Sequence, residues 1–167
     1  MAEAIRVASC EAMPLLRARI NPQTPKLVAS LLEGKSSTDL FPEAASPDCA
    51  LAGLWLRAGG WEQAHAIAQN VETREGFYWH ALVHRQEPDG FNAKYWLRQV
   101  GEHPIFPALA QAAQSYPVLE LPVEWKPGLF VDICVRPRSP AIAQAATELQ
   151  AAEWQLLFDF CAGSRTP

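Results

Sequence analysis

The chain has 167 residues, 49% of them hydrophobic and 19% charged, and its formal net charge is -4. This composition is typical of a single globular domain and excludes a disordered chain. The acidic balance argues against a general nucleic-acid binder, which is normally basic. Because no signal-peptide core is visible and no apolar run reaches about 18 residues, we expect no membrane span and a cytoplasmic location.

Residues 1–23 have no clear pattern and are expected to be irregular. The first predicted helix covers about residues 25–33, because Thr24-Pro25 is typical of a helix start and Gly34 of a helix end. Its inward side chains are expected to be Leu27, Leu31 and Leu32. Residues 35–45 are polar, contain a proline and are expected to form a loop.

The same start and stop signals predict a series of helices in the middle of the chain. They are expected from Pro47 to Gly59, over about 61–71, from Thr73 to the residue before Pro88, over about 92–100 and over about 107–115.

The C-terminal part is divided by prolines. Residues 116–138 read as an irregular, proline-rich connection, in which 129–135 are compatible with a short helix or a strand. Ser139-Pro140 opens the last and longest helix, which ends before Gly163. Its inward side is expected to hold Ile142, Ala145, Leu149, Ala152, Leu156 and Phe160. No repeat is visible, and the prediction is an all-α, single-domain bundle of about six to seven helices over residues 1–167.

The cysteines are widely separated and form no CxxC pair, so they are expected to be reduced and buried. They are Cys10, Cys49, Cys134 and Cys161.

All four histidines lie between Trp55 and His103, in an aromatic and charged stretch. His80 and His84 are four residues apart, which places both on one face of a helix, one turn apart. The rest of that helix is apolar nearly all round, so it is expected to be buried. A buried polar group without a partner costs about 1–3 kcal/mol, so each histidine should have something to bind.

One interpretation is a divalent metal such as zinc, with His80 and His84 as two ligands and His65, His103 or Glu87 as a third. Positions 81–83 are Ala-Leu-Val, so the HExxH motif of zinc proteases is absent. The alternative is a polar seam in which the same histidines are hydrogen-bonded to backbone or carboxylate groups.

A second interpretation is a clamp for an anionic small molecule, built from Arg85, Lys94 and Arg98. Glu87 and Asp89 are the competing explanation, because they could neutralise the same cations across the turn between two helices.

A third interpretation is acid–base catalysis without a metal. His80 or His84 would act as a base tuned by burial and by Glu87, and Tyr78 and Tyr95 would donate to an oxyanion. No serine or cysteine nucleophile lies in this stretch, so covalent catalysis is unsupported.

The run from Gly76 to Asp89, continued by Asn-Ala-Lys-Tyr-Trp at 92–96, resembles a family of uncharacterised, mostly bacterial proteins. Its members carry a Trp-His-x-x-x-His-Arg-x-Glu core followed by Asn-[Ala/Ser]-Lys-Tyr-Trp. The resemblance covers about residues 50–107 and implies a shared site without an assigned activity. It groups into one unit His65, His80, His84, Arg85, Glu87, Asn92, Lys94, Tyr95 and His103.

Two classes of function follow. The first is an enzyme or small-molecule site between central helices; whether it is an enzyme is left open. The second is a non-catalytic interaction protein, such as a homodimer, in which the cluster is a buried polar network. The catalytic candidates are His80, His84, Arg85 and Glu87; the ligand-binding candidates are Asn92, Lys94, Tyr95 and Arg98; the metal candidates are His65, His80, His84 and His103.

Overall fold

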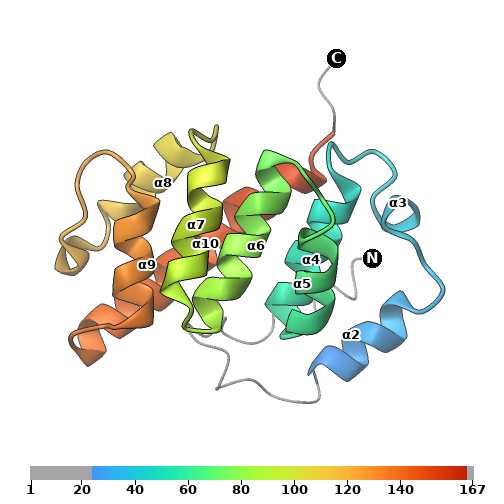
Figure 1. The fold of residues 1–167 in the computed structure, drawn as a ribbon, viewed down its shortest axis with the longest axis horizontal. Coiled ribbons are helices and arrows are strands. Elements are labelled where there is room, and N and C mark those ends of the chain that lie inside the picture. The colour runs from blue at the N-terminus through green and yellow to red at the C-terminus, as the bar shows by residue number, and fades with distance from the viewer. Residues whose placement is uncertain (1–23, 165–167) are drawn as a thin grey trace.

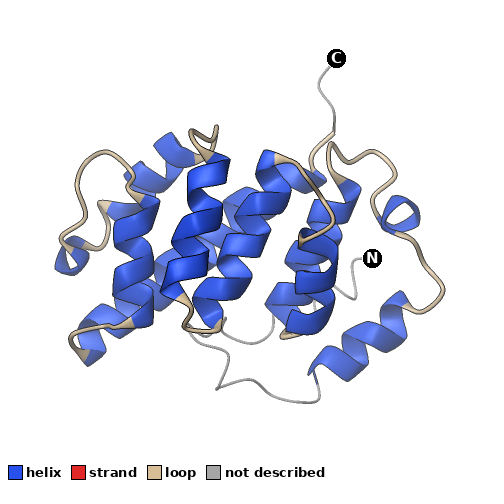
Figure 2. Cartoon of the chain, viewed as in Figure 1, coloured by secondary structure: helices blue, strands red, loops and turns tan. Residues whose placement is uncertain are grey.

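The computed structural model describes residues 24–164, which form nine α-helices and no strand (Figures 1 and 2). The predicted all-α class is therefore confirmed for this part of the chain, while the expectations for residues 1–23, Cys10 included, lie outside it. None of the described helices combines the length and apolarity that crossing a bilayer requires. The helices are α2 (Thr24–Leu32), α3 (Ser37–Leu40), α4 (Pro47–Ala58), α5 (Trp61–Ala68), α6 (Arg74–Gln86), α7 (Gly90–Val100), α8 (Phe106–Ala113), α9 (Pro127–Val135) and α10 (Pro140–Ala162).

The helices form two layers. In the front layer α5, α6, α7 and α9 lie side by side, each in contact with the next, and the long helix α10 runs behind them (Figure 1). Helix α10 also contacts α4, α8 and α9. Sequential neighbours in this layer are antiparallel hairpins joined by short turns, as the closely spaced stop and start signals predict.

One helix, α3, was not predicted, and another, α9, lies where the sequence left helix and strand open. The polar segment 35–45 contains α3, because Ser36 and Asp39 form a reciprocal capping box. The segment 116–138 contains a 3₁₀ turn at Pro117–Leu119 and the helix α9, so the choice between helix and strand at 129–135 is resolved as helix. Pro127 stands in the first turn of α9, where its missing N–H leaves no intrahelical bond unmade.

The buried face of α10 differs from the predicted one. Phe160 is 38% exposed, whereas Gln150 and Glu153 are fully buried. A prediction from the apolar residues of α10 alone cannot place these two polar side chains in the core, because their burial depends on their partners Tyr78 and Arg85 of α6. In α2, Leu32 is buried as predicted, whereas Leu27 is half exposed and Val28 is buried in its place.

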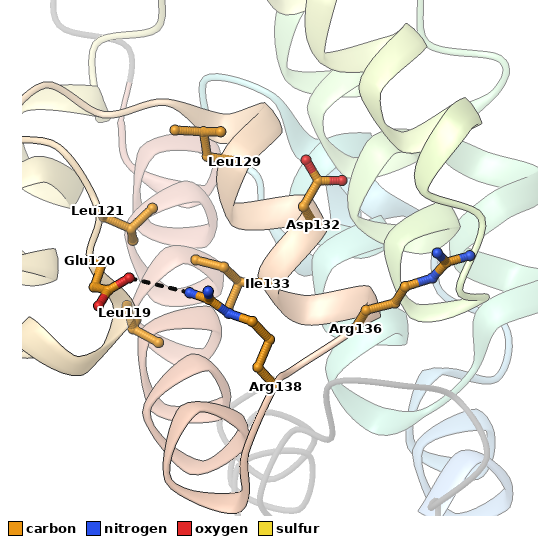
Figure 3. A pocket seen from close by; sticks show the side chains of 8 residues that line it. All are labelled: Leu119, Glu120, Leu121, Leu129, Asp132, Ile133, Arg136 and Arg138. Carbon is orange, nitrogen blue, oxygen red and sulfur yellow. Dashed lines mark hydrogen bonds and ion pairs between the residues drawn. The ribbon is translucent and has the colours of Figure 1, made fainter.

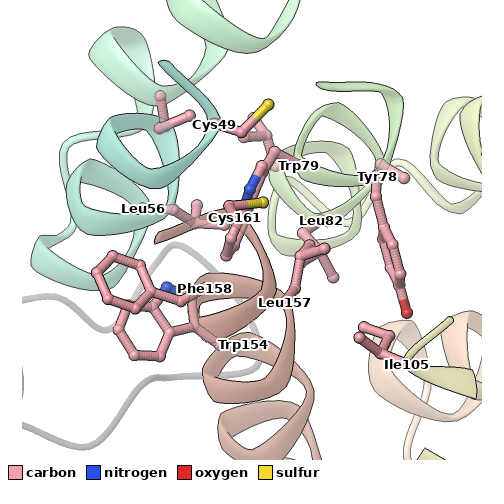
Figure 4. Close-up of a cluster of buried hydrophobic side chains, with 14 of the residues drawn as sticks. Cys49, Leu56, Tyr78, Trp79, Leu82, Ile105, Trp154, Leu157, Phe158 and Cys161 are labelled. Carbon is pink, nitrogen blue, oxygen red and sulfur yellow. The ribbon is translucent and has the colours of Figure 1, made fainter. Parts of the chain in front are cut away.

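The core is built around Trp79 of α6 (Figure 4). Gly53 of α4 permits this packing, since a Cβ there would stand 2.6 Å from the Trp79 ring. The indole of Trp154 donates a hydrogen bond to the Gly53 carbonyl at 2.7 Å. Cys49, Cys134 and Cys161 are buried and unpaired, as predicted. This packing holds α4, α6 and α10 together on the side of α6 away from α7.

Candidate metal centre

Helix α6 presents His80 and His84 on one face. The helix begins after Thr73, whose hydroxyl accepts a hydrogen bond from the Gly76 N–H at 3.2 Å. The two imidazole rings stack with their centroids 4.8 Å apart and their planes 25° from parallel. The predicted common face is therefore present.

His65 of α5 completes a group of three. Its Nε2 lies 2.8 Å from the Nε2 of His80, and its ring centroid lies 5.2 Å from that of His84. One ring nitrogen from each of the three histidines lies within 4.8 Å of the others. This cluster of His65, His80 and His84 is called the histidine triad below.

The short connection between α5 and α6 makes the close approach of His65 feasible. At Gly76 an added Cβ would stand 2.0 Å from the carbonyl oxygen of Val71, so only glycine lets the chain fold back this tightly. A glycine is required at position 76 because the backbone of Val71 lies against the start of α6. This close contact sets how α5 and α6 pack.

Helix α7 covers one side of the histidine triad. The Trp96 ring stacks on His80 with a centroid distance of 4.3 Å, and Phe77 stacks against the same indole at 5.5 Å. His80 is consequently buried, while His65 and His84 are only partly buried. The accessible side of the triad lies at His65 and His84.

Glu87 follows the end of α6 and faces His84. Its Oε2 lies 3.6 Å from His84 Nδ1. This contact is made to the Nδ1 of His84, so its Nε2 is the other possible ligand atom. A carboxylate against the outer nitrogen of an imidazole is the usual second contact of a metal-binding histidine.

The surroundings favour the neutral forms of His80 and His84. Burial first, and then the neighbouring His84 and His65, lower the pKa of His80 to about 4. The pKa of His84 is lowered by burial and by His65, although Glu87 and Asp89 act in the opposite direction. Neutral imidazole is the form that ligates metals.

The three ligand nitrogens lie within 4.8 Å of one another, so one metal ion would have to draw them together. Two nitrogens bound to a tetrahedral zinc at about 2.0–2.1 Å stand about 3.3 Å apart. The His65 and His80 Nε2 atoms, 2.8 Å apart, need only a small rotamer adjustment to reach this separation.

His103 does not belong to this group, which corrects the interpretation of all four histidines as one unit. Its Nδ1 accepts a hydrogen bond from the Ile105 N–H at 3.3 Å, and its ring packs against Tyr78 and Phe160. Helix α7 ends at Val100, with Gly101 as its C-cap. His103 Nε2 lies 3.7 Å from Glu75 Oε1.

Arg85 is buried and faces α10 rather than the histidine triad. It forms an ion pair with Glu153 at 2.5 Å, and its Nε donates to Gln150 Oε1 at 3.2 Å. The Tyr78 hydroxyl donates to the other carboxylate oxygen of Glu153 at 2.8 Å. Burial alone would lower the pKa of Arg85, but the charge of Glu153 more than compensates and raises it. The predicted anion clamp is therefore not assembled around Arg85.

Sequence reasoning missed Gln150 and Glu153. The signal that could have found them is the position of two polar residues, three apart, within the apolar face of the longest helix. Buried polar residues need partners, and the basic residue in an otherwise apolar α6 is the natural complement.

The remaining candidates lie along α7 and do not converge on the histidine triad. Asn92 donates to Asp89, which caps the helix. Lys94 pairs with Asp132 of α9 at 2.5 Å, so its expected neutralisation by Glu87 or Asp89 is not found. Arg98 lies over the exposed ring of Tyr95 at 5.8 Å.

A surface pocket of about 320 Å³ lies beside α9 (Figure 3). None of the candidate site residues lines it. Arg138 and Glu120, which both line the pocket, form an ion pair. A third charged lining residue, Asp132, pairs with Lys94 of α7. Its lining residues are Leu119, Glu120, Leu121, Leu129, Asp132, Ile133, Arg136 and Arg138.

Comparisons with protein-family models, curated proteins and solved structures found no match for this chain. The resemblance of residues 50–107 to a bacterial family therefore stays a prediction, and the chemistry of the histidine triad rests on its geometry.

Proposed function

We propose that His65, His80 and His84 bind one divalent transition metal, zinc in the first place. The observation that carries this proposal is the convergence of three imidazoles from two neighbouring helices, with their ligand atoms within 4.8 Å of one another. The donor set consists of imidazoles alone. Imidazole suits zinc, copper, iron and nickel, whereas calcium and magnesium take oxygen ligands.

A metal accounts for the whole histidine triad better than hydrogen bonding does. The hydrogen bond between His65 and His80 joins two rings and leaves His84 outside it. A metal ion would use all three. Burial and the neighbouring imidazoles also lower the pKa of His80, which favours the neutral form that ligates a metal.

A structural role is favoured for Arg85 and the buried polar residues around it. Arg85, Tyr78, Gln150 and Glu153 form a fully buried polar network between α6 and α10. We propose that this network fixes the position of α6 against α10 and takes no part in binding a ligand.

The test is a zinc titration of chelator-treated protein, followed with a competing chromophoric chelator. The wild type should bind one equivalent, and His65→Ala, His80→Ala and His84→Ala should each weaken binding at least tenfold. The matched control is His103→Gln, which changes a buried histidine outside the triad and should leave the zinc affinity unchanged. Circular dichroism checks that each variant is folded.

Two results would overturn the proposal. One is a folded wild type that binds no zinc, cobalt, nickel, copper or iron. The other is an equal loss of affinity in His103→Gln and in the three triad variants, which would point to binding at scattered surface groups.

A further inference from the structure

We infer that the metal held by the histidine triad keeps an open coordination position and takes a small exchangeable anion there, such as hydroxide, azide or a carboxylate. This inference rests on the proposed function and goes further, because a metal site closed by protein ligands would be structural, while an open one binds a ligand or substrate.

The histidine triad offers three protein ligands to a metal ion. Within the described residues the metal-capable group contains His65, His80 and His84 and no fourth member. Structural zinc sites have four protein ligands, whereas catalytic sites have three and a water. Three imidazoles are therefore an incomplete set for zinc.

The neighbouring carboxylates, Glu87 and Asp89, do not supply a fourth ligand. Glu87 lies against the outer nitrogen of His84, at 3.6 Å from Nδ1, which is the place of a positioning residue rather than of a fourth ligand. Asp89 caps α7 and accepts from the backbone and side-chain N–H groups of Asn92 at 3.0 and 2.7 Å. Neither of the two carboxylates whose charge acts on His84 belongs to the group of three possible metal ligands.

One side of the histidine triad is accessible to solvent. Trp96 covers the His80 side of the triad. His84 keeps 13% of its side chain exposed, and His65 is partly exposed as well. We therefore expect the fourth coordination position on the side of His65 and His84, away from Trp96.

The charge of the metal ion with its three ligands favours an anion. Three neutral imidazoles do not reduce the double positive charge of the metal ion. A metal in such a donor set acidifies its bound water and prefers an anion in the remaining position. This is why the inferred ligand is an anion rather than a neutral alcohol or amine.

The test uses cobalt(II) in place of zinc, because the visible absorption of cobalt reports its coordination. Chelator-treated full-length protein is loaded with one equivalent of cobalt and titrated with sodium azide and, separately, with sodium acetate. We expect the absorption bands between about 500 and 650 nm to shift with saturation, while dialysis finds the cobalt still bound. His103→Gln should give the same titration, and His65→Ala should lose the starting spectrum.

The outcomes separate the two proposals. Stoichiometric cobalt with a spectrum that neither anion changes would mean a closed site, which overturns the open position and leaves metal binding intact. A wild type that binds neither cobalt nor zinc overturns the metal site, and the open position with it. A saturable shift that is equally present in His65→Ala would place the anion at a different cobalt site and would also overturn this inference.

Discussion

His65 and His80 face each other through their Nε2 atoms at 2.8 Å, although they are 15 residues apart in the chain. At this distance one Nε2 must donate a proton and the other must accept it, because two facing lone pairs would repel. In the metal-free protein the two imidazoles therefore have different tautomers.

This relationship predicts a change of tautomer on metal binding. Zinc would ligate both Nε2 atoms, so both rings would carry their proton on Nδ1. Long-range proton–nitrogen correlation spectra of the ¹⁵N-labelled protein measure this directly. His103 is an internal control: its Nδ1 accepts from the Ile105 N–H, so its proton is on Nε2 with and without zinc. Unchanged spectra of His65 and His80 at saturating zinc would contradict the prediction.

Glu87 should act as a positioning residue for His84. Replacing it in Glu87→Gln removes the carboxylate 3.6 Å from Nδ1, and we expect zinc affinity to fall by about 10–100-fold. The melting temperature of the metal-free protein should change little, because Glu87 is partly exposed. The exposed Glu62→Gln on α5 is the matched control and should keep the wild-type zinc affinity. Equal affinities of the two variants would contradict this role.

The buried pair of Arg85 and Glu153 should dominate the stability of the contact between α6 and α10. Arg85→Met leaves Glu153 buried without its cation, at an expected cost of about 3–5 kcal/mol in the free energy of unfolding. The double variant Arg85→Met/Glu153→Met should lose less, since no unpaired charge stays buried. Urea unfolding measures both.

The control for this pair is Lys94→Met, which breaks the exposed pair of Lys94 with Asp132. Exposed ion pairs contribute at most about 1 kcal/mol, so this variant should unfold close to the wild type. If Arg85→Met costs no more than Lys94→Met, the buried network has no special structural role.

Gly53 should not tolerate a side chain. In Gly53→Ala the new methyl group would stand 2.6 Å from the Trp79 ring, and such overpacking costs about 1–3 kcal/mol in the free energy of unfolding. Gly128→Ala in α9 is the control: nothing lies within 4 Å of its Cβ position, so alanine should be neutral or stabilising by up to about 1 kcal/mol. Chemical denaturation that ranks the two variants in the opposite order would contradict the packing described for Trp79.

His103 should make the stability depend on pH. Burial lowers its pKa from 6.5 to about 4, so between these values the unfolded chain binds a proton that the native protein does not. Its stabilising contribution is complete above about pH 6.5 and is lost as the pH falls toward 4, at up to about 1.4 kcal/mol per pH unit. His103→Gln should make this slope shallower in metal-free protein. The same slope in both proteins would contradict the assignment, because His80 and His84 contribute equally to both.

The local pattern of the chain was enough to predict where most helices begin and end. Thr73 before α6 and Pro88 after it define a helix in which His80 and His84 must share a face, because a spacing of four residues is about one helical turn. The segments around α3 and α9 were harder, because a capping box and a helix-initiating proline stand there among loop-forming residues.

The sequence by itself determined that His80 and His84 share one face of a helix, since a spacing of four residues is about one helical turn. Only the tertiary structure decided which of the other residues join them. His65 comes to the triad and His103 does not, and Arg85 finds Glu153 at a distance of 68 residues in the chain. The physical reason is that helical periodicity acts within a few residues, whereas contacts between helices depend on how whole faces pack.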